Sequence, residues 1–252
     1  MKKNITLIIL VTTLIVSIAF IFKPDSNDVA DYQTLYSNRI KEFKQKQIGL
    51  VSLIDECDLS NEEQLEKIKI KIQQTRVQLK GIDFWLRYLE PISYKKINGP
   101  LPVEWETEVF EKHEAPYKRE AAGLTLAYLY IEEDEIDKIE LKRLIQESVE
   151  ATDVYLADSI TKQLDSYHHF YLCNRLYLLN LAAIYTTGFE CPDTELVLPE
   201  LLSMLKDVQH MYGSYNKRFP SATLNDEYLN LYKKTIEFVF NQSSEINAFD
   251  HF

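Results

Sequence analysis

The spacing of apolar residues along this chain is that of amphipathic helices. Over residues 29–54 they recur every three or four positions, which predicts a first long helix. A second helix is expected to begin at Ser60, because Ser60 and Glu63 have the spacing of a capping box. It runs to about Leu89, and Pro91 ends it. Both segments are rich in charged residues, so we expect them to pair as antiparallel neighbours.

The rest of the chain repeats the helical pattern after an interruption. Residues 91–116 contain prolines and an Asn98-Gly99 turn, and they predict an ordered excursion between helices. The acidic run Glu132–Glu135 is expected to form the first turn of the helix that follows it, because carboxylates favour the positive end of the helix dipole. Further helices are predicted at about 117–131, 134–159, 161–185, 193–212 and 225–241.

One of these predicted helices differs from the others. The segment 161–185 is apolar nearly all round, which is typical of a helix at the centre of a fold. Gly188 follows it and is suited to end it in a left-handed conformation. No segment of useful length alternates with the period of a strand, and the chain has only six glycines. The pattern therefore predicts an all-α protein, an up-and-down bundle or array of six to seven helices.

The N-terminal segment is different in kind. Residues 5–22 carry no charge, no glycine and no proline, and as a helix they would rise about 27 Å, enough to cross a bilayer core. Lys2 and Lys3 would stay on the cytoplasmic side. Residues 1–24 are therefore expected to be a signal anchor, with a cleaved signal peptide as the alternative. We expect residues 25–252 to form a periplasmic helical domain, held at the inner membrane by residues 5–22.

Charge and cysteine content narrow the partners and the chemistry. The formal net charge of the whole chain is −11, and beyond residue 23 it is −14, from 25 basic and 39 acidic residues. A body this acidic repels nucleic acid, so no nucleic-acid partner is expected. The three cysteines, Cys57, Cys173 and Cys191, are too few for a disulfide framework. A single Cys173–Cys191 bridge stays open as an alternative.

Few residues suggest chemistry. The sequence has no Cys-x-x-Cys-His haem motif, no phosphate-binding glycine loop and no His-Glu-x-x-His zinc helix, so no catalytic residue is assigned. His169 and Cys173 are four residues apart on a predicted helix and are weak candidates for sharing a metal, with a core role as the alternative. Tyrosines around residues 167–185 are expected to be core aromatics, with electron relay as the alternative.

Two stretches together resemble a known family. The first contains Arg76, Lys80, Tyr88-Leu89-Glu90-Pro91 and Ile97-Asn98-Gly99-Pro100, and the second contains Asn174-Arg175, Gly188-Phe189-Glu190-Cys191-Pro192 and Leu198-Pro199-Glu200. In this order and spacing they resemble the N-terminal helical domain of exported di-haem cytochrome c peroxidases of Bacteroidetes-type bacteria. That domain is itself similar to the imelysin-like fold. The resemblance spans roughly residues 30–252.

The resemblance implies a non-catalytic domain that scaffolds or docks haem-based electron transfer and peroxide reduction carried out elsewhere. A c-type haem is expected only in a further domain or a partner, because this chain has no haem motif. The expected partners are a c-type haem peroxidase module or a cytochrome electron donor. In the family the haem domain follows the helical one, so we expect either a split system or a fragment of a longer protein.

The chain departs from the imelysin pattern at its metal motif. Where that family has Gly-x-His-x-x-Glu, this sequence has Gly123, Thr125 and Tyr128, which argues against a metal site. Two alternatives stay open: a stand-alone imelysin-like periplasmic iron-binding protein, and an exported helical interaction protein unrelated to redox chemistry. The residues that form either partner-facing corners or ordinary structural turns are Asn98, Gly99, Pro100, Gly188, Phe189 and Pro192.

Overall fold

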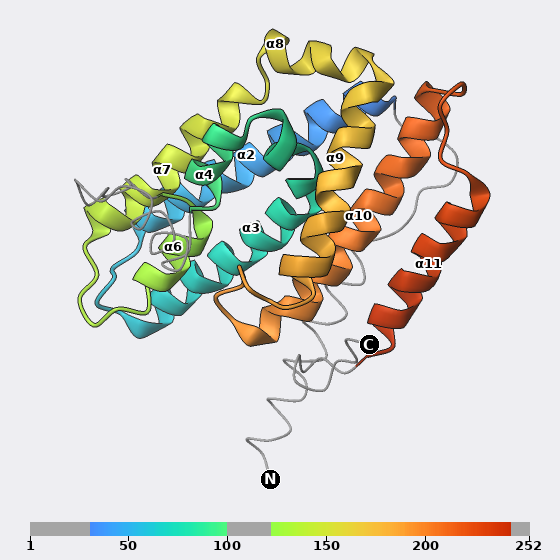
Figure 1. Cartoon of the computed structure of the whole chain (residues 1–252). Coiled ribbons are helices and arrows are strands. Elements are labelled where there is room, and N and C mark those ends of the chain that lie inside the picture. The colour runs from blue at the N-terminus through green and yellow to red at the C-terminus, as the bar shows by residue number, and fades with distance from the viewer. Residues whose placement is uncertain (1–30, 100–121, 243–252) are drawn as a thin grey trace, which may run out of the picture. The chain divides into compact units, whose positions relative to one another are not determined.

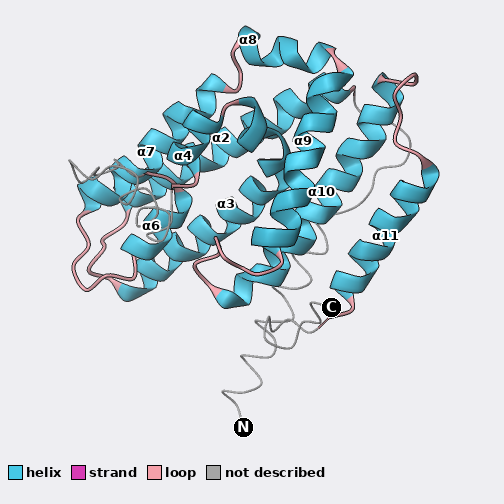
Figure 2. Cartoon of the chain, viewed as in Figure 1, coloured by secondary structure: helices cyan, strands magenta, loops and turns pink. Residues whose placement is uncertain are grey.

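The computed structural model describes residues 31–99 and 122–242, and every regular element in these ranges is helical (Figure 2). This part of the chain contains nine α-helices, which confirms the predicted all-α class. The number exceeds the predicted six to seven because residues 91–97 and 158–161 form short helices of their own. Among the described residues, β-type pairing is limited to one backbone bridge between Asn98 and Gly123.

The elements follow one another along the chain in the order of their labels in Figure 1. Their bounds are α2 Tyr32–Glu56, α3 Glu62–Leu89, α4 Pro91–Ile97, α6 Leu124–Tyr130, α7 Lys138–Val154, α8 Asp158–Thr161, α9 Tyr167–Asn180, α10 Val197–Arg218 and α11 Asp226–Phe240. Two 3-10 segments, Lys162–Asp165 and Thr194–Leu196, and a π-helical segment, Leu181–Tyr185, complete the order.

Helix α3 lies at the centre of the fold. It packs against α2, α4, α6, α9 and α10, and 13 of its 28 residues are buried. In Figure 1, α2, α4, α6 and α7 lie to one side of α3, and α9, α10 and α11 lie to the other. Helix α2 packs on α7 as well as on α3, and α11 packs on α10. Each flanking helix therefore reaches α3 directly or through one neighbour.

The prediction that the helix at 161–185 is central was wrong. Its counterpart α9 buries one face, which includes Phe170, Cys173 and Tyr177. On the opposite face, Leu172 is 42% exposed and Leu179 is 59% exposed. The count of apolar residues was misleading, because several of them, among them Tyr171, Leu172 and Leu179, lie on the exposed side of the helix.

Two predicted helix starts also need correction. Asn61, and not Ser60, caps α3: its side chain accepts hydrogen bonds from the backbone N–H of Glu63 at 3.0 Å and of Gln64 at 3.1 Å. Ser60 instead donates its hydroxyl to Asp58 at 2.8 Å. The predicted capping box fails because Asn61 takes the cap position and because the Ser60 backbone N–H, which Glu63 would have accepted, donates to Asp58 Oδ1 at 3.0 Å.

The acidic run Glu132–Glu135 does not begin α7. It forms turns after α6, and α7 begins at Lys138, where the Asp137 side chain accepts a hydrogen bond from Ile139 N at 2.9 Å. Asp137 caps the helix because its short side chain reaches a free backbone N–H group, whereas Asp134, an aspartate within the run, is not used as a cap. Pro91, expected to end one helix, also occupies the first turn of α4.

Gly188 adopts the left-handed conformation predicted for it, with φ of 71°. The turn brings the chain back so closely that a β-carbon on residue 188 would lie 2.7 Å from Cγ2 of Val197, at the start of α10. The glycine is therefore required twice, for its backbone angle and for the close approach of α10.

No helix in the described ranges combines the length and the apolarity needed to cross a bilayer. The expected anchor, residues 5–22, lies outside the described residues, as do Pro100, residues 101–116 of the predicted excursion and residues 117–121 of the helix predicted after it. The anchor and its consequence for location stay predictions.

We expect Gly188→Ala to lower the free energy of unfolding by about 1–2 kcal/mol or more, because alanine resists a left-handed backbone and its methyl group would meet Val197. Gly213→Ala is the matched control: Gly213 is exposed within α10 with nothing within 4 Å of its β position. It should stabilise by roughly 0.5–1 kcal/mol. Urea unfolding followed by circular dichroism measures both, and equal effects would contradict the structure of this turn.

Candidate functional site

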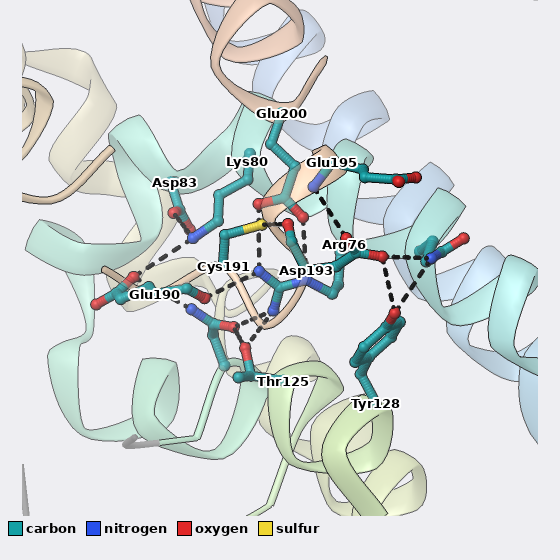
Figure 3. Close-up of polar contacts among 12 residues, drawn as sticks. Arg76, Lys80, Asp83, Thr125, Tyr128, Glu190, Cys191, Asp193, Glu195 and Glu200 are labelled. Atoms are coloured by element: carbon teal, nitrogen blue, oxygen red, sulfur yellow. Dashed lines mark hydrogen bonds and ion pairs between the residues drawn. The ribbon is translucent and has the colours of Figure 1, made fainter. Parts of the chain in front are cut away.

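The most unusual feature of the interior is a row of charged residues on one face of α3. Arg76, Lys80, Asp83 and Arg87 are spaced four, three and four residues apart, which places them on one side of the helix. Glu190, in the turn before α10, and Glu200, within α10, face them (Figure 3). The side chains of all six are at most 14% exposed. We call these six residues the buried ionic cluster.

Arg76 uses all five of its N–H donors. Its Nε and one Nη2 hydrogen donate to the two oxygens of Glu200, at 3.0 and 3.2 Å. The other Nη2 hydrogen donates to the backbone oxygen of Glu190 at 3.1 Å. Nη1 donates to Asn98 Oδ1 at 3.2 Å and to the hydroxyl of Thr125. Burial lowers the pKa of Arg76, but Glu200 and other nearby groups together raise it by more. The net pKa lies above its usual value, so the guanidinium stays charged.

The other half of the cluster surrounds Glu190. Its Oε2 accepts from Arg87 and lies 3.4 Å from Lys80 Nζ. Lys80 also lies 3.4 Å from Asp83 Oδ2, and Tyr185 donates its hydroxyl to the same oxygen at 3.2 Å. The three cations and three carboxylates of the cluster balance, so it has no net charge with which to attract an ionic ligand.

Burial by itself raises the pKa of Glu190, but Lys80 and Arg87 lower it more strongly, and the result is a pKa below the usual value. Cys191, beside the cluster, behaves in the opposite way: burial raises the pKa of its thiol to about 12. A thiol that stays protonated at neutral pH is a poor nucleophile and a poor metal ligand.

A small cavity adjoins the cluster and is lined in part by Lys80, Tyr185, Glu190, Cys191 and Glu200. Its volume is about 20 Å³. A single water molecule needs roughly 10–15 Å³ on this scale, so the cavity has room for one water and none for a substrate. Together with Asn98 and Thr125, which bond Arg76, the cluster therefore holds five segments of the chain together, and the cavity beside it is too small for a substrate.

The predicted corner residues divide between this cluster and the surface. Asn98 is buried and bonds Arg76, and Gly99 N donates to the backbone oxygen of Ala122 at 2.9 Å. Gly188 lines the cavity, whereas Phe189 is 47% exposed and Pro192 is half-buried. Asn98 and Gly188 are thus structural. Pro100 lies outside the described residues.

Thr125 and Tyr128, which stand where imelysin-type proteins have metal ligands, are both engaged in hydrogen bonds. Thr125 bonds Arg76 and donates to Asn98 Oδ1 at 2.5 Å. Tyr128 donates to Asp193 Oδ2 at 2.9 Å. In the described ranges, no three histidine, cysteine, aspartate or glutamate side chains lie close enough together to hold a metal ion.

The weak metal candidates His169 and Cys173 lie on the buried face of α9, but the histidine nitrogens are engaged. Nδ1 of His169 bonds the backbone oxygen of Ser166, and Nε2 lies 3.1 Å from the hydroxyl of Tyr32. Burial raises the pKa of the Cys173 thiol well above its usual range. Cys173 and Cys191 are both free thiols, so the alternative of a bridge between them is wrong.

Sequence reasoning did not identify the cluster as a site. Arg76, Lys80, Glu190 and Glu200 attracted notice only as parts of the two stretches that carry the family resemblance. In the structure those two stretches meet in the buried ionic cluster. A usable signal was the spacing of three cations and an acid along one face of the helix, continuing into its apolar C-terminal half. Comparison of the chain with family models, curated proteins and solved structures found no match.

We expect Glu200→Gln to lower the free energy of unfolding by about 3–5 kcal/mol, because it leaves the Arg76 charge buried without its counterion. Asp55→Asn is the matched control, since Asp55 pairs with Lys142 at 2.7 Å and both side chains are at least 40% exposed. Its cost should be below about 1 kcal/mol. Urea titration of both variants measures the difference, and similar small effects would contradict the structural role of the cluster.

Protonation of Glu190 at low pH should lower the free energy of unfolding. Because its pKa is lowered in the folded state, its stabilising contribution is present above the unfolded pKa and is lost as the pH falls below about 4. Glu190→Gln should therefore be less stable at neutral pH and should lose less further stability on acidification. The measurement is the urea midpoint from about pH 6 to about pH 3.

Asp207 should affect the pH dependence of stability in the opposite direction to Glu190. Burial raises its pKa more than Arg39, 2.9 Å away, lowers it. Its contribution to stability therefore grows on acidification, and Asp207→Asn should steepen the acid loss that Glu190→Gln reduces. Identical pH profiles for the two variants would contradict both assignments.

Proposed function

We propose that this chain is a non-catalytic helical docking domain, tethered to a membrane by residues 5–22, which receives a c-type haem protein of a di-haem peroxidase-like system. Chemistry belongs to that partner. The observation that carries the proposal is the exposed apolar face of α9, described below, on a domain whose interior cluster is closed.

The cavity beside the buried ionic cluster has no room for a substrate, so we place the function of this domain on its surface. The formal charges of the buried ionic cluster balance one another, and the adjoining cavity of about 20 Å³ admits no substrate. A domain of this kind acts through what it binds on its outside.

The outer face of α9 has the composition of a binding surface. It consists of Tyr171, Leu172, Leu178 and Leu179, which are between 37% and 59% exposed. Exposed Arg175 lies between them on the same side of the helix. Several large apolar residues gathered around one arginine are typical of the centre of a protein interface.

This chemistry fits an exposed haem edge. A haem presents an apolar ring margin and two anionic propionate groups, so apolar side chains around one guanidinium complement it. The family resemblance supports the same partner, because in that family the helical domain is joined to haem domains. Asn174-Arg175 is also part of the second stretch that carries the resemblance.

The first test is genomic. Two Cys-x-x-Cys-His motifs are expected downstream of codon 252 or in an adjacent reading frame. The protein that carries them, purified with its haems, then serves as the ligand for titration calorimetry with the full chain. Absence of such motifs from the whole neighbourhood would contradict the haem association.

Leu179→Glu should weaken binding of that haem protein by about tenfold or more, because it places a charge in the centre of an apolar contact. Ile139→Glu is the matched control, since Ile139 is 78% exposed but lies on α7. It should leave the affinity unchanged. Equal affinities for the wild type and the Leu179 variant would overturn the assignment of the α9 face.

A further inference from the structure

A directed chain of hydrogen bonds links three side chains in the aromatic part of the interior. Trp85 Nε1–H donates to the hydroxyl of Tyr32 at 2.7 Å, and that hydroxyl lies 3.1 Å from Nε2 of His169. Nδ1 of His169 bonds the backbone oxygen of Ser166. An indole only donates and a carbonyl only accepts, so Nδ1 carries the hydrogen and Nε2 is the acceptor. The chain therefore runs from Trp85 through Tyr32 to His169.

Burial fixes the protonation states of these three hydrogen-bonded side chains. Tyr32 and Trp85 are 0% exposed and His169 is 5% exposed. Burial raises the pKa of Tyr32 well above its usual range, so the phenol keeps its proton. Burial lowers the pKa of His169 against the opposing effect of the carbonyl oxygens of Ser166 and Gln163. At neutral pH the pair is a phenol hydrogen-bonded to a neutral imidazole.

We propose that Tyr32 is a site of reversible one-electron oxidation, in which its phenolic proton moves along the existing hydrogen bond to Nε2 of His169. A high-potential one-electron oxidant takes one electron from Tyr32 and is reduced by one. The O–H bond of Tyr32 breaks and an N–H bond forms on His169, which leaves a neutral tyrosyl radical beside an imidazolium. Return of the electron and the proton restores the starting pair.

The base is what distinguishes Tyr32 from its neighbours. Tyr36, which also packs on Trp85, donates its hydroxyl to the backbone oxygen of Tyr155 at 2.8 Å. A carbonyl oxygen accepts a hydrogen bond but does not take the proton. Oxidation of Tyr36 would therefore leave an acidic proton with no base to receive it, whereas oxidation of Tyr32 does not.

Tyrosine rings lead from this buried pair to the surface. The ring centre of Tyr32 lies 5.9 Å from that of Tyr215, and Tyr215 lies 6.2 Å from Tyr171. Tyr171 is 41% exposed and belongs to the outer face of α9. An oxidant bound at Tyr171 takes the electron from Tyr32 by tunnelling through the rings of Tyr215 and Tyr171. Neither of these rings is itself oxidised, because both hydroxyls donate to the backbone oxygen of Ala222, which does not take a proton.

This inference goes beyond the docking function and does not depend on the haem partner, because the test uses a chemical oxidant. The full chain, in mild detergent, is mixed with ruthenium tris-bipyridine and a sacrificial electron acceptor, and a light flash generates the ruthenium(III) oxidant. Transient absorption follows the radical, and electron paramagnetic resonance identifies it. In wild type we expect a long-lived tyrosyl radical whose spectrum shows magnetic coupling to isotope-labelled histidine.

Tyr32→Phe should lose this long-lived radical, and Tyr36→Phe, the matched control, should keep it. His169→Phe should reduce its yield severalfold, because the proton acceptor is gone. Tyr171→Phe should slow its formation without moving it to another residue. Circular dichroism confirms that each variant is folded.

The wild-type coupling to labelled histidine makes the test independent of the core variants. A long-lived radical without that coupling, or one that survives unchanged in folded Tyr32→Phe, would overturn the proposal. So would a radical confined to Tyr171, which would place the oxidation at the surface alone.

Discussion

The guanidinium of Arg76 is the group on which the arrangement of the other elements depends. A buried donor without a partner costs roughly 1–3 kcal/mol, and more when it is charged. The five donors of Arg76 are met by Asn98, Thr125, Glu190 and Glu200. These partners come from the end of α4, from α6, from the turn before α10 and from α10 itself. Each of those segments must therefore be held against α3 for the fold to bury Arg76.

The same constraint limits what the cluster can do chemically. A guanidinium with all its donors bonded has no capacity left for a substrate. The cluster is neutral, its cavity admits one water, and the neighbouring thiol keeps its proton. What the fold leaves available is its outside, where α9 presents leucines and a tyrosine around Arg175. That division between a closed interior and an apolar surface is the basis for proposing a docking domain.

The helices were predictable from sequence because they depend on residues close together in the chain. The period of three to four predicted α2, α3 and α10, and Gly188 predicted the turn where it occurs. The partners of α3 were not predictable, because Arg76 and Glu200 are 124 residues apart and a single sequence gives no sign that they meet. The segment 161–185 was placed at the centre because it is apolar nearly all round. Ser60 failed as a cap for local reasons, because Asn61 takes the cap position and Asp58 accepts the Ser60 backbone N–H.

The buried ionic cluster and the hydrogen-bonded residues Trp85, Tyr32 and His169 are built in a similar way but differ in their chemistry. In both, buried side chains bond partners from distant parts of the chain, as Tyr32 and His169 do at 137 residues apart. In the ionic cluster the partners carry opposite fixed charges, so moving a proton would leave a charge unpaired in the interior. In the Tyr32 chain every member is neutral, and its direction ends on a base beside a phenol. There a proton moves over one hydrogen bond while the packing stays intact. The aromatic core where α2, α3 and α9 meet is therefore the part suited to electron transfer.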